Sequence, residues 1–311
     1  MRIAIIGAGS LGTVIGALIT KSGKYDVTLV DADIANVEAL TKFGATVKGP
    51  IEVNVPVKAI TPGQMSGIYD LAFILTKQIF NENVLNNLKK FITEASIVCS
   101  LQNGMPEEEF LKFLPKEQVI GGSVGFGATW LGPGVSQITS SMISMEKYAF
   151  YIGELDGQIT ERIKIVAEIL GNVGHCDILD SLIATRWTKI MNNSAFSGLS
   201  AALGCTFGEV LDHEETLYAA ANISSEVIKT LKAAGYKLVK MQGEDKGYLE
   251  LERPEDAPKL YADYKRVWEK NRLLKASMLQ DLEKGRRTEI DFINGYVCRK
   301  ARELGVETPY N

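Results

Sequence analysis

The sequence predicts an α/β fold in which a parallel sheet is followed by an all-α C-terminal part. Strand-like apolar runs alternate with helical patterns over the first half of the chain, and this alternation indicates a parallel sheet with helices on both faces. From Ser181 onward almost every segment has helical periodicity, and few β-branched runs remain. We therefore expect two domains, residues 1–180 and residues 181–311.

The expected strands are short, apolar and often β-branched, and they cover residues 3–6, 27–30, 72–76, 97–100, 119–124, 135–138, 149–152 and 176–179. The expected helices carry apolar residues at helical spacing, and they cover residues 11–21, 34–42, 82–91, 106–113, 161–170, 182–202, 217–234, 258–278 and 289–304. The dipeptide Pro133-Gly134 is a turn signal, which predicts an antiparallel hairpin added after the parallel core.

The chain begins with MRIAIIGAGSLG, a strand followed by the pattern G-x-G-x-x-G and then by a helical pattern. Gly7 allows the tight turn, Gly9 lets backbone amides approach a pyrophosphate, and Gly12 lets the helix pack closely on the strand. The helix N-terminus then faces the negative charge. The loop residues Gly7, Gly9, Ser10, Leu11 and Gly12 therefore predict a Rossmann-type, dinucleotide-binding first domain.

Asp31 follows the second strand and bears on the choice of cofactor. A carboxylate at this position can accept hydrogen bonds from the adenosine 2′-OH, and it repels a 2′-phosphate. The next residues, Ala32 and Asp33, supply no basic side chain for that phosphate. Asp31 therefore favours NAD over NADP. The alternative is a solvated aspartate that caps the next helix, a role that Asp33 could equally fill.

The composition excludes several classes of protein. The net charge of −4 over 311 residues argues against a surface for nucleic acid or for anionic membranes. No apolar run approaches the length of a membrane span, and the N-terminus reads as a core strand rather than a signal peptide. The 4 cysteines are scattered without a C-x-x-C pattern, which predicts reduced thiols, a cytoplasmic location and no metal site.

Histidine is scarce, and this excludes some mechanisms. The chain has 2 histidines, His175 and His213, and neither has a neighbouring arginine that could hold a carboxylate. We interpret both as structural. A reaction that moves a proton would therefore need another side chain as the donor.

The polar residues that follow strands, or lie on the first helix of the second domain, are the candidates for such a role. Lys77 and Asn103 follow two predicted strands, where ligands of this fold bind. Lys189, Asn193 and Ser197 are four residues apart and share one helix face. Lys189 could instead be a solvated helix lysine, and Glu289 could be a first-turn carboxylate that interacts with the helix dipole.

Several motifs together resemble the ketopantoate reductase (2-dehydropantoate 2-reductase) family along nearly the whole chain. They are GAGSLG, LTKQ, LQNG, a central GPG, W-x-K-x-x-x-N, SMLQDLEKGRRTEIDFINGYV and TPYN. The resemblance implies a Rossmann-type domain joined to a helical domain, with the active site in the cleft between them. It also implies NADPH-dependent reduction of a 2-oxo acid to a (R)- or D-2-hydroxy acid, as in pantothenate biosynthesis.

The resemblance also implies roles for individual residues. Lys189 matches the general acid, and Glu289 matches the carboxylate that orients substrate and lysine. Residues near the nicotinamide and the lysine correspond to Asn103 and Lys77, and substrate ligands correspond to Asn193 and Ser277. Physical chemistry agrees, because hydride arriving at a ketone builds an alkoxide that needs a positive charge and a proton. Burial would lower the pKa of such a lysine toward the working pH.

The chain departs from the family pattern at two positions and at its end. Ser197 stands where the family usually has a second asparagine, which leaves room for a branched or aromatic 2-oxo acid. Asp31 replaces the basic neighbourhood that many relatives use for NADP. Relatives commonly continue beyond the position of Asn311, so the chain is either truncated or a short member.

We expect a reductase whose default substrate is ketopantoate, with Lys189, Glu289 and Asn103 as catalytic residues and Asn193, Ser197 and Ser277 as substrate ligands. The cofactor is NAD(H) by the Asp31 argument and NADP(H) by the family default. The first alternative is an NAD-dependent D-2-hydroxyacid dehydrogenase of the D-mandelate type. The second alternative is a dinucleotide sensor without catalysis. The sequence leaves open whether the chain forms a homodimer through its helical part.

Overall fold

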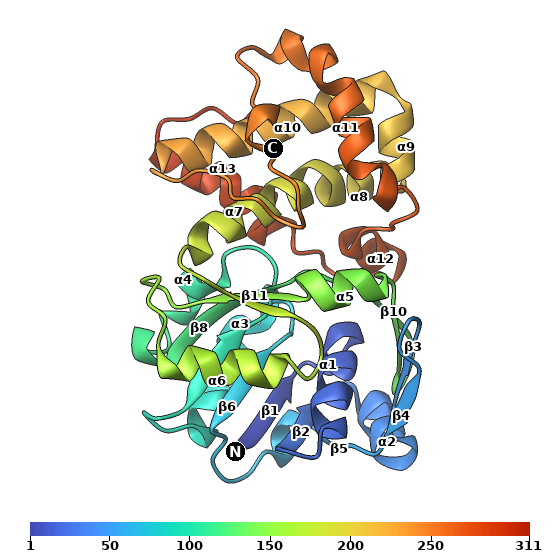
Figure 1. Cartoon of the computed structure of the whole chain (residues 1–311), viewed down its shortest axis with the longest axis vertical. Coiled ribbons are helices and arrows are strands. Elements are labelled where there is room, and N and C mark those ends of the chain that lie inside the picture. The colour runs from blue at the N-terminus through green and yellow to red at the C-terminus, as the bar shows by residue number, and fades with distance from the viewer. The chain divides into compact units, whose positions relative to one another are not determined.

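Eight strands form one large sheet in the first part of the chain, and the computed structural model describes residues 1–311. The strand order is β12-β11-β8-β7-β6-β1-β2-β5. Their bounds are β1 Arg2–Ile6, β2 Asp26–Val30, β5 Lys58–Ile60, β6 Leu71–Ile74, β7 Ile97–Ser100, β8 Val119–Val124, β11 Phe150–Gly153 and β12 Cys176–Leu179. The predicted α/β fold with a large N-terminal sheet and a helical C-terminal part is confirmed (Figure 1).

Six neighbouring strands of the sheet are parallel and follow the Rossmann order, namely β5, β2, β1, β6, β7 and β8. Numbered along the chain, they lie in the order 3-2-1-4-5-6, and the order reverses between β1 and β6. Ligands of such sheets bind outside the carboxyl ends of the strands at this reversal. The sheet is mixed at one edge, because β11 is antiparallel to β8 while β12 is parallel to β11.

Helices cover both faces of this sheet, as Figure 1 shows. Their bounds are α1 Ser10–Lys21, α2 Ile34–Phe43, α3 Asn81–Leu88, α4 Pro106–Phe110, α5 Met142–Tyr148 and α6 Glu161–Leu170. Successive residues of β1 point to opposite faces. Ile3 and Ile5 belong to the apolar core under α1 and α6, whereas Ala4 and Ile6 belong to the core under α3 and α4.

A second sheet of four short strands lies in the same part of the chain, in the order β4-β3-β10-β9. The bounds are β3 Ala45–Lys48, β4 Val53–Val55, β9 Ala128–Gly132 and β10 Val135–Ile138. β9 and β10 are antiparallel across Pro133-Gly134, so the predicted hairpin forms. Gly134 has a φ of +72° and donates its N–H to Oδ1 of Asn36 at 2.8 Å, which ties the turn to α2.

The remaining helices belong to the second part of the chain. Their bounds are α7 Leu182–Asn192, α8 Leu199–Leu203, α9 Phe207–Asp212, α10 Glu214–Ala233, α11 Tyr261–Trp268, α12 Ser277–Glu283 and α13 Asn294–Glu303. A π-helical stretch, Asn193–Gly198, joins α7 to α8, and we call it the π segment. None of these helices has the length and apolar character that a membrane crossing requires.

Backbone contacts divide the chain into two compact units. The nucleotide unit contains residues 1–102 and 106–182, and the helical unit contains residues 103–105 and 183–311. The short LQNG turn after β7 is thus shared, because Asn103 is grouped with the helical unit and Met105 lies in its apolar core. The functional roles that we assign to the two halves stay predictions.

An aromatic cluster forms the centre of the helical unit. The Phe196 ring, in the π segment, stacks on Trp268 at 4.6 Å between centroids, and Trp268 stacks on Tyr264 at 4.9 Å. Phe207 contacts Phe196 at 5.2 Å. The π segment is therefore packed into the core through Phe196.

Two predicted helices are wrong in extent. The helix expected over 258–278 is interrupted after Trp268, because the carbonyls of Arg272 and Leu274 accept the N–H groups of Gly208 and Phe207 at the start of α9. A segment that serves as a cap for another helix cannot also continue its own. The helix expected from residue 289 begins at Asn294, after a short turn over Ile290–Phe292.

Candidate functional site

The glycine-rich loop has the close approaches that its sequence predicts. Gly7 has a φ of +99°, and its N–H donates to the carbonyl oxygen of Val30 at 2.8 Å. A Cβ at position 12 would lie 1.9 Å from the carbonyl oxygen of Gly7, so only glycine fits there. At Gly9 the position of a Cβ meets no atom within 4 Å. The loop is thus packed tightly on the strand side and open at Gly9.

This open side lies at the start of α1. Gly9 is exposed, Ser10 is partly exposed and Leu11 is partly buried against the core. The first turn of the helix carries no acidic side chain. Backbone amides at a helix N-terminus attract anions. The arrangement therefore fits a dinucleotide whose pyrophosphate approaches the backbone at Gly9.

Asp31 lies directly after β2 and is bound to the same loop. Its carboxylate accepts the N–H of Asp33 at 2.9 Å, the backbone N–H of Ala8, and Nδ2 of Asn36 at 3.4 Å. Burial raises the pKa of Asp31, and these hydrogen bonds oppose the rise. Asp33, not Asp31, caps α2 by accepting from Ala35 and Asn36. The capping alternative for Asp31 is therefore wrong.

Lys77 follows β6, the neighbour of β1 at the reversal of strand order. It precedes the short turn Gln78–Phe80. The loop that carries it is fixed by Gln102, whose Nε2 donates to the carbonyl oxygen of Thr76 and to Oδ1 of Asn81, each at 2.7 Å. Lys77, Asp31 and the glycine loop thus all lie at the carboxyl ends of adjacent strands.

In the helical unit, Lys189 lies near two buried charges. Arg186 is 1% exposed and Glu289 is 6% exposed, and both interact with the Lys189 ammonium. Burial and then the positive charge of Arg186 lower the pKa of Lys189, the carboxylate of Glu289 raises it, and the net pKa is about 7. Part of the Lys189 residue stays exposed, although its ammonium is desolvated. The alternative that Lys189 is an ordinary solvated helix lysine therefore does not hold.

Asn193 and Ser197 lie one and two turns after Lys189, at the start and near the end of the π segment. Both side chains are partly exposed. A π-helical turn holds more residues than an α-helical turn, so residues four apart stay on nearly the same face. Single-turn π segments inside α-helices occur often at functional sites.

The other predicted residues of this unit come from separate segments. Ser277 is exposed at the first position of α12, and α12 packs against the π segment and α8. Glu289 lies in the loop before α13, and Asn103 is partly exposed in the LQNG turn. Glu289 lies near enough to Lys189 for its carboxylate to raise the pKa of the Lys189 ammonium. The roles of all these residues stay proposals.

Sequence reasoning missed Arg186. It precedes Lys189 by three residues, which places both on one side of α7. Helix arginines are usually solvated, so the sequence alone gave no reason to expect a buried one. The one signal that could have found Arg186 is its spacing of three residues from Lys189.

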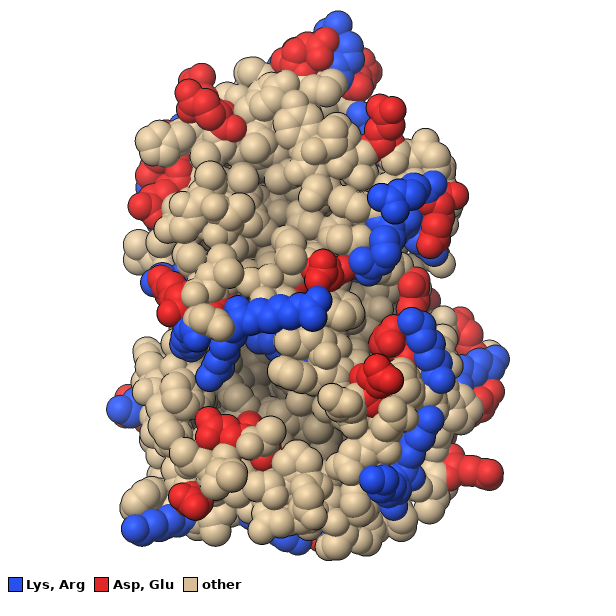
Figure 2. Space-filling model, turned by 180° about the vertical axis from the view of Figure 1, so that it is seen from behind, with Lys and Arg blue, Asp and Glu red and all other residues tan.

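Other surface features carry none of the predicted site residues. Figure 2 shows basic and acidic side chains next to one another over the face that it draws. His175 contacts Asp177 at 2.8 Å at the surface, and His213 precedes α10.

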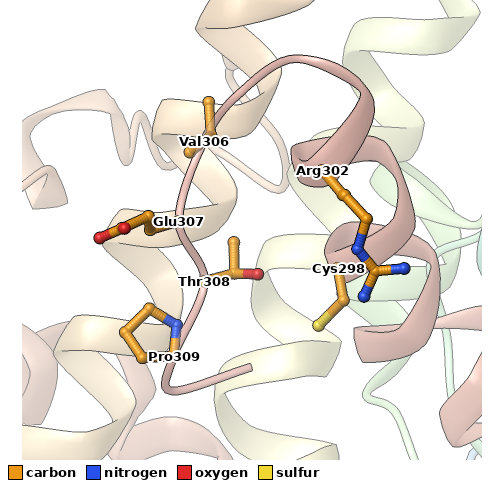
Figure 3. A pocket seen from close by; sticks show the side chains of 6 residues that line it. All are labelled: Cys298, Arg302, Val306, Glu307, Thr308 and Pro309. Carbon is orange, nitrogen blue, oxygen red and sulfur yellow. The ribbon is translucent and has the colours of Figure 1, made fainter.

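A hollow of 490 Å³ lies between α13 and the following segment, as Figure 3 shows, lined by Cys298, Arg302, Val306, Glu307, Thr308 and Pro309. No group of three or more His, Cys, Asp or Glu side chains could hold a metal ion.

Comparison with known families gives matches over nearly the whole chain. Residues 3–157 match the family described as "Ketopantoate reductase PanE/ApbA", and residues 181–311 match "Ketopantoate reductase PanE/ApbA C terminal". The chain is 32% identical over 312 residues to a 2-dehydropantoate 2-reductase of Archaeoglobus fulgidus. That alignment covers 100% of this chain and 94% of the relative.

Solved structures share the fold over the whole chain. A D-mandelate dehydrogenase in a ternary complex with NADH and anilino(oxo)acetate is 26% identical, with a TM-score of 0.83, and the match covers 100% of this chain and 94% of that one. A 2-dehydropantoate 2-reductase of Geobacter metallireducens is 27% identical, with a TM-score of 0.83 and coverage of 100% and 96%.

Two glycine substitutions should have opposite consequences. Gly12→Ala should destabilise the nucleotide unit by about 1–3 kcal/mol, because the methyl group collides with the Gly7 carbonyl. Gly9→Ala should leave the melting temperature unchanged, because its methyl group enters open space, and should weaken dinucleotide binding about tenfold or more. Thermal melting and fluorescence titration with the dinucleotide measure the two effects. Unchanged binding in Gly9→Ala would contradict the placement of the pyrophosphate.

Proposed function

Because the chain belongs to the ketopantoate reductase family of NAD(P)-dependent oxidoreductases that act on CH–OH donors, we propose that it reduces a 2-oxo acid to the D- or (R)-2-hydroxy acid. Ketopantoate is the default substrate, since curated relatives that are 32% and 30% identical to this chain are named 2-dehydropantoate 2-reductases. The observation that carries the proposal is a desolvated Lys189 whose pKa is lowered to about 7.

A lysine with this pKa suits the proton that the reaction requires. When bound, the reduced nicotinamide supplies the hydride, which forms the new C–H bond at the substrate's carbonyl carbon. The electrons of the C=O π bond then move to oxygen, and the Lys189 ammonium gives that oxygen its proton and becomes a neutral amine. General acids work best when their pKa lies near the working pH. Before it gives up the proton, the positive charge of Lys189 also stabilises the developing alkoxide.

The remaining residues would orient the reactants. Glu289 interacts with Lys189 and can hold its ammonium toward the substrate oxygen. In the proposal Asn193, Ser197 and Ser277 bind the 2-oxo acid, because their segments pack together in the helical unit. Asn103 is assigned to the same site from the family motif LQNG.

For the cofactor, we propose a preference for NAD(H). The support is the position of Asp31 at the end of β2, with its carboxylate held beside the glycine loop by Ala8 and Asn36. A carboxylate in this place accepts the ribose hydroxyl and repels a 2′-phosphate. The structurally similar D-mandelate dehydrogenase was solved with NADH.

A second candidate function has specific support. Ser197 is shorter than the asparagine of the family pattern, and the D-mandelate dehydrogenase has a TM-score of 0.83 with this chain. Both observations favour an NAD-dependent D-2-hydroxyacid dehydrogenase that takes branched or aromatic 2-oxo acids. The general acid and the cofactor site would be the same.

Initial rates with three 2-oxo acids separate the two candidates. With NADH as reductant, ketopantoate should give the highest kcat/KM if the default holds. A preference of tenfold or more, about 1.4 kcal/mol, for 2-oxoisovalerate or phenylglyoxylate would instead support the second candidate. Binding of NADH without its oxidation by any of the three acids would contradict both and favour a sensor.

Charge substitutions beside Lys189 should move the pH dependence in opposite directions. The kcat/KM for reduction should fall as pH rises through about 7, because Lys189 then loses the proton that it donates. Arg186→Gln removes a positive charge and should move this limb to higher pH, whereas Glu289→Gln removes a negative charge and should move it to lower pH. Shifts of both variants in the same direction would contradict the proposed acid.

Lys189→Ala provides the matched control for that profile. It should lower kcat by about 10²–10⁴-fold and abolish the limb, while dinucleotide affinity stays close to that of the parent protein. Turnover equal to that of the parent would exclude Lys189 as the proton donor.

Removal of the Asp31 charge should change the choice of cofactor. Asp31→Asn keeps an acceptor for the N–H of Asp33 but no longer repels a 2′-phosphate. We expect the ratio of kcat/KM for NADH to that for NADPH to fall about 10- to 100-fold. Asp33→Asn is the control, because asparagine caps helices as well as aspartate, and its ratio should not change. An unchanged ratio in Asp31→Asn would show that Asp31 does not select the cofactor.

A further inference from the structure

A buried carboxylate binds Tyr310 and Asn311, in the segment after α13. Glu226, on α10, is 7% exposed, and its Oε1 accepts the backbone N–H of Tyr310 at 2.9 Å. Its Oε2 accepts the backbone N–H of Asn311 at 2.9 Å and Nδ2 of the same residue at 2.7 Å. Asn311 Nδ2 also donates to the carbonyl oxygen of Ile223 at 3.1 Å. Asn311 is thus held in one orientation by α10.

The segment before Asn311 returns along α13. Figure 3 shows the chain from Val306 to Pro309 beside the helix that carries Cys298 and Arg302. This return brings the side chain of Asn311 to the first residue of α13. There, Nδ2 of Asn294 donates to Oδ1 of Asn311 at 3.2 Å.

Asn294 in turn contacts the π segment at two points. Its Nδ2 donates to the carbonyl oxygen of Ser194 at 3.4 Å. A Cβ at position 198 would lie 2.6 Å from Oδ1 of Asn294, so the amide packs directly on the backbone of Gly198. Ser197 lies between these two contacts.

The burial of the Asn294 amide is unfavourable, which argues that this residue does more than fill space. Asn294 is 5% exposed, and its Oδ1 has no hydrogen-bond partner. A buried polar atom without a partner lowers stability, so an apolar residue would fill the same space at lower cost. What Asn294 adds is an amide donor to the backbone of a π-helical turn, a geometry that is rare without outside support.

We propose that Asn294, held in place through Asn311, is a positioning residue that keeps the π segment in the shape that binds substrate. The π segment carries Asn193 and Ser197, so this inference rests on the proposed function. The network from Glu226 to the π segment then links Tyr310 and Asn311 to the recognition of the 2-oxo acid.

The test compares Asn294→Ala and Asn311→Ala with Tyr310→Phe. Tyr310→Phe loses the hydroxyl contact to Tyr218 but keeps the backbone N–H that Glu226 accepts, so it is the matched control. Asn311→Ala removes the support one step from the π segment, and it keeps the test informative if Asn294→Ala folds poorly. Each variant is assayed well below its melting temperature.

Two readouts are needed. The KM for the 2-oxo acid should rise about tenfold in Asn294→Ala and less in Asn311→Ala, while the Kd of the dinucleotide stays within twofold. Hydrogen exchange of the amides from residue 194 to residue 199 should become faster in the same order. Tyr310→Phe should change neither. A merely structural role would lower the melting temperature without moving KM.

Each outcome decides one claim. An unchanged KM in both alanine variants of an active protein would overturn the positioning role. Unchanged exchange of the π-segment amides would overturn it as well, and this result does not depend on turnover. A parent protein that reduces no 2-oxo acid would contradict the proposed function, and faster exchange in Asn294→Ala would then support only the control of the segment's shape.

Discussion

A positive charge placed inside the helical unit is the constraint on which the proposed chemistry depends. The Lys189 ammonium loses most of its hydration and has Arg186, a second cation, beside it, and both effects lower its pKa to about 7. Glu289 supplies the opposing negative charge. Desolvation of an ion costs several kcal/mol, and a nearby counter-charge offsets only part of that cost. The surrounding helices must therefore hold these three side chains firmly, because any loosening would let water restore the ordinary pKa.

The packing of the helical unit meets that requirement. α7 continues without a break into the π segment, and Phe196 anchors that segment in the aromatic cluster with Trp268. The amide of Asn294 holds the same segment from the side of α13. Lys189, Asn193 and Ser197 thus lie on one continuous element. In the nucleotide unit, the close contacts of Gly7 and Gly12 fix the loop in the same way and leave Gly9 open.

Much of this could be predicted from the sequence, because the decisive patterns are local. The β1–α1–β2 unit follows from the G-x-G-x-x-G spacing, and Asp31 lies where that unit places it. The antiparallel β11 and the break between α11 and α12 could not be predicted, because both depend on contacts with distant segments. The π segment has no sequence signature, since an extra residue in a turn is stabilised by tertiary contacts. Arg186 was missed for a related reason, because its burial is a property of the packed unit.

The central claim is that Lys189 titrates near neutral pH, and NMR of the protein with 13C-labelled lysine tests this most directly. Substitution of Lys189 or Lys246 by methionine assigns the two lysines whose pKa burial lowers, to about 7 and about 8 respectively. The account predicts a Lys189 resonance with a midpoint near pH 7, which moves upward in Arg186→Gln. A Lys189 midpoint close to the ordinary value of 10.5 would contradict it.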